Sequence, residues 1–135
     1  MKKIVLALVL LIAICLPLNS TAGEHFFDTI MDETLSGPKE TKQVNLAGYK
    51  EFTVFVSMTI APTTGEKGLR AVELDIMQSP APGGGFRLAR ETVFPVAKGP
   101  ALFKNTYRIY LPYISVAVVN PSPDTKAQIF VYAVY

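Results

Sequence analysis

The sequence has few of the residues that carry catalysis, metal binding or covalent cross-links. Its 135 residues include one cysteine, one histidine and no tryptophan. Cys15 has no second cysteine to pair with, which excludes an internal disulfide framework. A catalytic triad would have to use His25, close to a chain end where rigid support is not expected. The fold must therefore be held together by its hydrophobic core.

The first 22 residues have the pattern of a secretory signal peptide. Lys2 and Lys3 give a positive start, residues 4–16 are apolar without a break, and Ser20 and Ala22 are small residues suited to cleavage. The apolar run is shorter than the about 20 residues that span a membrane. We therefore expect cleavage after Ala22, a processed chain without a membrane span, and a secreted, periplasmic or extracellular location.

The charge of the chain is balanced once this segment is removed. Lys2 and Lys3 account for two of the thirteen basic residues, so residues 23–135 hold eleven basic and eleven acidic residues. A nucleic-acid-binding protein needs a basic stripe that neutralises phosphates. No such stripe is visible, and nucleic acid is not expected as a partner.

From about residue 41 onwards, short apolar stretches alternate with clusters of proline and glycine, as in an all-β protein. The clearest stretch is 51–60, where Phe52, Val54 and every second residue after them are apolar, a period of two that predicts a half-buried strand. Further strands are expected at 44–46, 69–77, 86–94, 102–111, 113–119 and 127–135. Seven or eight such strands predict a two-sheet antiparallel β-sandwich of the jelly-roll kind.

The segment between the signal peptide and the first clear strand allows two interpretations. Phe26, Phe27, Ile30 and Met31 fit helical spacing, but a strand over 29–35 that pairs with the C-terminal strand is equally consistent. We therefore divide the chain into a signal peptide (1–22), an N-terminal segment of strand or short helix (23–40) and a β-sandwich domain (41–135).

The C-terminal strand is apolar on both of its faces. One face holds Ala127, Ile129, Val131 and Ala133, and the other holds Phe130, Tyr132 and Val134. A strand on one layer of a sandwich normally has a polar outer face. Either the N-terminal segment covers the second face, or the chain forms a homo-oligomer through this strand.

Aromatic residues are the only feature that points to a binding site. Phe55, Tyr110 and Tyr132 fall on faces expected to point outward, and exposed aromatic patches often bind glycans or proteins. We predict that these three residues contact a ligand, which is a glycan or a protein surface.

No residues combine into a catalytic or metal-binding motif. Glu73 and Asp75 share one strand face, which is the normal appearance of a solvated strand. Asp28, Asp32 and Glu33 lack the spacing of a calcium loop. Gly83 to Gly85 is not followed by Lys-Ser or Lys-Thr, so it is no phosphate loop. We expect no enzyme activity, no metal and no cofactor.

The strand pattern resembles that of small secreted jelly-roll modules, such as carbohydrate-binding and discoidin-like domains. The resemblance covers 41–135 and is carried by Leu46 to Tyr49, which leads into one strand, and by Tyr110 to Tyr113, which leads into another that ends at Asn120. The tryptophan platforms and terminal disulfide of those families are absent. The resemblance implies the fold and no binding residue; the absence of a catalytic set beside many tyrosines and phenylalanines predicts a secreted, non-enzymatic binding module. The alternative is a self-associating structural subunit of an extracellular or envelope assembly.

Overall fold

The computed structural model describes residues 25–62 and 69–135. The expected signal peptide, the cleavage site after Ala22 and Cys15 lie outside the described residues, as do residues 63–68. No helix occurs in the two described ranges, and therefore none that could cross a membrane.

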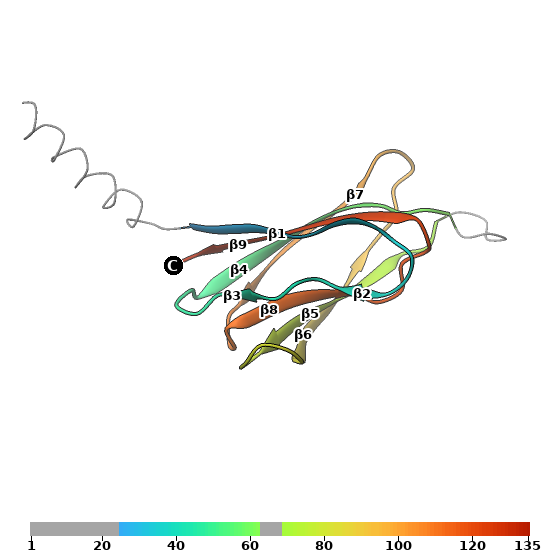
Figure 1. The fold of residues 1–135 in the computed structure, drawn as a ribbon. Helices are drawn as coiled ribbons and strands as arrows, with labels where there is room; N and C mark the ends of the chain where they lie inside the picture. Colours follow the sequence, from blue (N-terminus) through green and yellow to red (C-terminus); the bar gives the residue numbers. More distant parts are fainter. Residues whose placement is uncertain (1–24, 63–68) are drawn as a thin grey trace, which may run out of the picture.

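The described residues form nine strands in two antiparallel sheets, which Figure 1 shows as two layers. The strands are β1 (His25–Leu35), β2 (Lys39–Glu40), β3 (Val44–Asn45), β4 (Glu51–Thr59), β5 (Val72–Ser79), β6 (Phe86–Val93), β7 (Ala101–Arg108), β8 (Tyr113–Val118) and β9 (Thr125–Val134). The four-stranded sheet has the order β1-β9-β4-β7, and the five-stranded sheet has the order β2-β8-β5-β6, with β3 also paired to β8. The all-β, two-sheet prediction is confirmed.

The order of the strands is that of a jelly roll. The short strands β2 and β3 both pair with β8 and act as one interrupted strand. Counted together, they leave eight strand positions, and the chain changes layer between successive positions except from β5 to β6, as in a jelly roll. The sequence analysis missed β2, because its two residues, Lys39 and Glu40, are too few to show a period.

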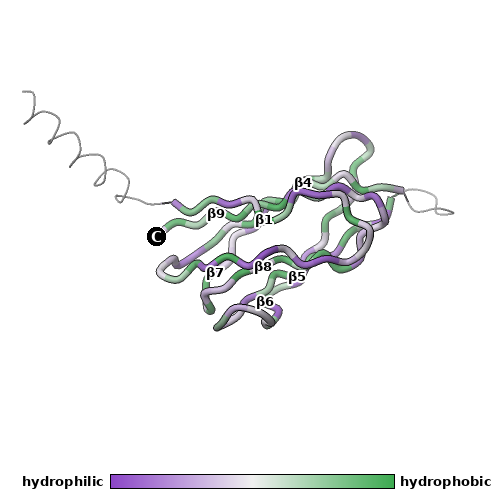
Figure 2. Tube along the Cα trace, viewed as in Figure 1, coloured by the Kyte–Doolittle hydropathy of each residue, from purple (hydrophilic) through white to green (hydrophobic). Residues whose placement is uncertain are grey.

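The core consists of the apolar faces of both sheets. Along β4 every second side chain is buried, from Phe52 to Met58, and along β5 the same holds for Val72, Leu74 and Ile76. Figure 2 shows the resulting alternation of hydrophobic and hydrophilic positions along the strands. The inward residues predicted from the period of two are therefore the residues that fill the core.

The N-terminal segment is a strand, not a helix. β1 pairs with β9 along its whole length, from His25 opposite Val134 to Leu35 opposite Thr125. A bulge between Thr29 and Met31 turns both Ile30 and Met31 into the core, and this interruption of the strand period gave the segment its apparent helical spacing. The strands β1 and β2 are therefore part of the sandwich, although the division expected from the sequence placed residues 23–40 outside the domain 41–135.

Polar contacts join the two sheets at both open sides. On the β1 side, Lys42 Nζ lies 2.7 Å from Asp28 Oδ2 and Lys39 Nζ lies 2.8 Å from Glu33 Oε1. On the opposite side, the hydroxyl of Tyr107 on β7 donates a hydrogen bond of 2.9 Å to Glu91 on β6. The pKa of Tyr107 is raised above its ordinary value, mainly because the hydroxyl is partly buried and in second place because of this hydrogen bond.

Two phenylalanines on β4 provide a test of the layer arrangement. Phe52 is 1% exposed, whereas Phe55 lies on the opposite face of the strand and is only half-buried. We expect Phe52→Ala to lower the free energy of unfolding by about 3–5 kcal/mol, because it opens a cavity in the core. Phe55→Ala should lower it by about 1 kcal/mol or less. Urea denaturation measures both, and equal losses would contradict the arrangement.

Candidate functional site

The outer face of the four-stranded sheet, opposite the core, carries exposed or half-buried side chains. β9 lies in the middle of this sheet, with β1 on one side and β4 on the other. The N-terminal strand therefore pairs with the edge of β9 and does not lie over its second apolar face. Phe130 and Tyr132 remain half-buried on that face.

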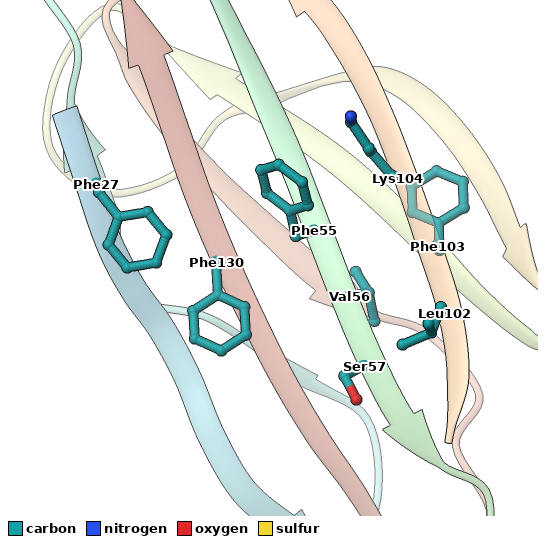
Figure 3. A pocket seen from close by; sticks show the side chains of 8 residues that line it. All are labelled: Phe27, Phe55, Val56, Ser57, Leu102, Phe103, Lys104 and Phe130. Carbon is teal, nitrogen blue, oxygen red and sulfur yellow. The ribbon is translucent and has the colours of Figure 1, made fainter. Parts of the chain in front are cut away.

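Four apolar side chains form a diagonal line across this face, one from each strand. Phe55 on β4 lies directly opposite Phe130 on β9. Phe27 on β1 is paired with Tyr132, which is two residues from Phe130 towards one end of the sheet. Leu102 on β7 is paired with Ser57, which is two residues from Phe55 towards the other end. Phe27 is 64% exposed and Leu102 is 76% exposed. We call these four residues, Phe27, Phe130, Phe55 and Leu102, the apolar stripe; Figure 3 shows them.

The apolar stripe lines a shallow open groove of about 550 Å³. The rings of Phe27 and Phe130 are stacked, with centroids 5.8 Å apart and planes inclined by 19°. Lys104 Nζ lies 5.4 Å from the centroid of the Phe55 ring, in cation–π contact. Among the described residues that line the groove, Ser57 and Lys104 have the only polar side chains, and the rest of this lining is hydrophobic.

Hydrogen-bonded polar side chains flank the groove at one end. The ring of Tyr132 stacks on His25, with centroids 5.4 Å apart, and its hydroxyl lies 2.7 Å from His25 Nδ1. The hydroxyls of Thr53 and Thr106 lie 2.8 Å apart across the β4–β7 pair. These groups contact each other, whereas the side chains of the apolar stripe have no atoms that form hydrogen bonds.

The structure brings together two of the three predicted ligand residues. Phe55 lies in the groove, and Tyr132 lies on the same face at its flank. Tyr110 is 66% exposed but follows the end of β7 and does not line the groove. Whether these residues bind a ligand stays a prediction.

Sequence reasoning missed most of the groove. In the sequence, Phe27 has a spacing that also fits a helix, and Phe130 stands out only as part of the C-terminal strand that is apolar on both faces. Leu102 and Lys104 carry no signal of their own. They face outward because Phe103 and Tyr107, on the same strand, pack against the core. That alternation could have indicated both residues, but only pairing with β4 places them beside Phe55.

The two acidic residues considered as catalytic candidates, Glu73 and Asp75, are paired with one arginine side chain. Asp75 accepts hydrogen bonds from Arg90 Nε at 2.7 Å and from its terminal nitrogen at 3.0 Å, and Glu73 lies 3.7 Å from the same guanidinium. The hydrogen bonds from Arg90 hold the pKa of Asp75 below its ordinary value. In residues 25–62 and 69–135, no three His, Cys, Asp or Glu side chains converge as metal ligands.

Comparison with known proteins supports the fold alone. No protein-family model and no curated protein sequence matches the chain. Among solved structures, the chain is similar to the SPBc2 prophage-derived protein YomS, with a TM-score of 0.52 and 12% sequence identity. The alignment covers 84% of this chain and 95% of YomS. At this identity the likeness extends to the β-sandwich and not to a function.

The Asp75–Arg90 pair predicts a specific pH dependence. A carboxylate whose pKa is lowered on folding stabilises the folded protein at pH values above the ordinary pKa of the carboxyl group. This contribution is lost as the pH falls through the lowered pKa of the folded state. We expect Asp75→Asn to cost about 1 kcal/mol of unfolding free energy at pH 7 and little at pH 2. Glu73→Gln, at the longer contact, is the control with a smaller effect. An Asp75→Asn cost that is equal at both pH values would contradict the assignment.

Proposed function

We propose that this protein is an exported, non-catalytic interaction module that binds its partner through the apolar stripe. The observation that carries the proposal is the exposure of Phe27 and Leu102 in line with Phe130 and Phe55. Burying one large apolar side chain contributes about 1.5–3 kcal/mol, so four adjacent ones can hold a partner. A monomer that left them in water would gain nothing from placing them together.

The chemistry of the groove favours an apolar protein surface over a glycan. A sugar presents hydroxyl groups that need several hydrogen-bond partners, and the groove offers only Ser57 and Lys104. One face of the Phe55 ring is already covered by the ammonium of Lys104. A hydrophobic side chain of a protein partner, with an acidic group near Lys104, matches this lining better.

Export and the absence of catalysis belong to the same proposal. The positive start, apolar run and small residues of 1–22 support export. The acidic side chains most suited to hydrolysis, Glu73 and Asp75, are held by Arg90. A stable folded surface with no accessible acid–base pair in the groove is suited to recognition.

The site can be tested with an apolar fluorescent anion. Anilinonaphthalene sulfonate has rings that suit the groove and a sulfonate that suits Lys104, and its fluorescence rises on transfer out of water. We expect the folded chain to bind this probe, and Phe27→Ser to weaken binding at least fivefold. Lys104→Gln should weaken it about two- to threefold, through loss of an exposed charge contact.

Phe86 provides a matched control, because it is 64% exposed, as Phe27 is, but belongs to β6 of the other sheet. Phe86→Ser should leave probe binding unchanged. Titrations are run with variants whose unfolding midpoints match that of the unsubstituted chain. The proposal fails if Phe86→Ser and Phe27→Ser weaken binding equally, or if the folded chain does not bind the probe.

A further inference from the structure

We propose that the partner of the apolar stripe is a second copy of this chain, packed outer face to outer face through the four-stranded sheets. This inference rests on the proposed function, since it names the occupant of the same surface. Two observations carry it, the symmetry of the stripe and the positions of the charges beside it, and the size of the face sets the expected strength.

The size of the outer face limits how strong a dimer can be. Four strands at about 4.8 Å spacing, with nine residues at about 3.3 Å each along β4, give a face of about 19 by 30 Å. Two such faces whose strands cross near a right angle overlap over about 19 by 19 Å and bury about 700 Å² in total, which is the size of a weak, transient interface. The dimer is therefore expected to be concentration-dependent.

The diagonal direction of the stripe allows it to pack against itself. From Phe27 to Leu102 the stripe passes three strand spacings of about 4.8 Å across the sheet and two same-face steps of about 6.6 Å along the strands, so it crosses the strands at roughly 50°. A two-fold axis along the stripe places the Phe55–Phe130 pair of one copy on the same pair of the other. The strands of the two copies then cross at close to a right angle, which is one of the two preferred packings of β-sheets.

The charges beside the stripe complement each other under the same two-fold axis. Asp32, on β1, lies on one side of the stripe, and Lys104 and Arg108, on β7, lie on the other. All three side chains are exposed. Rotation about the stripe brings Asp32 of one copy over β7 of the second copy, between its Lys104 and Arg108. Each dimer therefore contains this contact twice.

The test is the mass of the purified chain in solution, measured by light scattering and sedimentation over a range of concentrations. We expect a reversible change from monomer to dimer as the concentration rises. Phe27→Ser should weaken the dimer at least tenfold, because it removes one ring from each side of the interface. Phe86→Ser, the equally exposed control, should dimerise as the unsubstituted chain does.

A charge exchange tests the orientation of the two copies. Asp32→Lys alone should weaken the dimer about two- to fivefold, as should Lys104→Asp alone, because each places like charges opposite each other. The double variant Asp32→Lys with Lys104→Asp restores one attractive contact and should recover most of the lost affinity. Losses that simply add in the double variant would overturn the proposed orientation.

The outcomes distinguish this inference from the proposed function. A chain that stays monomeric at every concentration, yet binds the fluorescent anion through Phe27, overturns the second copy and leaves the binding module. A dimer that Phe27→Ser does not weaken overturns the assignment of the face. If the chain is monomeric and also fails to bind the probe, both the inference and the proposed function are wrong.

Discussion

The pairing of β9 with both β1 and β4 determines where the apolar residues of this chain lie. β9 has hydrophobic side chains on both faces, and its central place leaves neither edge free. One face, from Ala127 to Ala133, fills the core. The other face points away from the core, so Phe130 and Tyr132 remain at the surface. The candidate site is thus a direct consequence of the sheet order.

The same pairing explains how a chain without disulfides closes. β1 adds the fourth strand and, through its bulge, contributes Ile30 and Met31 to the core. Asp28 and Glu33 on this edge strand pair with Lys42 and Lys39, which lie in and just after β2 at the edge of the other sheet. Charges near an edge strand also discourage further strand addition at that edge. In the proposed dimer, association is thereby directed away from the β1 edge and towards the outer face.

The sequence was sufficient to predict the fold class and most of the strands. Alternation with a period of two is local, so it identified β4, β5 and the buried face of β9 before any pairing was known. It failed where the alternation is interrupted or too short, at the bulge of β1 and at the two residues of β2. The groove was only partly predictable, since its residues come from four strands and meet only through their register. Phe55 and Tyr132 could be recognised as outward, but the neighbourhood of Phe27, Leu102 and Lys104 could not.

The most direct test of the account compares two phenylalanines within one sample. Phe27 and Phe86 are equally exposed in the single chain, but only Phe27 belongs to the apolar stripe. Hydroxyl-radical footprinting read by mass spectrometry reports the oxidation of each ring at low and at high protein concentration. The account predicts that Phe27 becomes protected as the concentration rises while Phe86 stays equally reactive. Equal reactivity of Phe27 at both concentrations, in a sample whose mass has doubled, would contradict it.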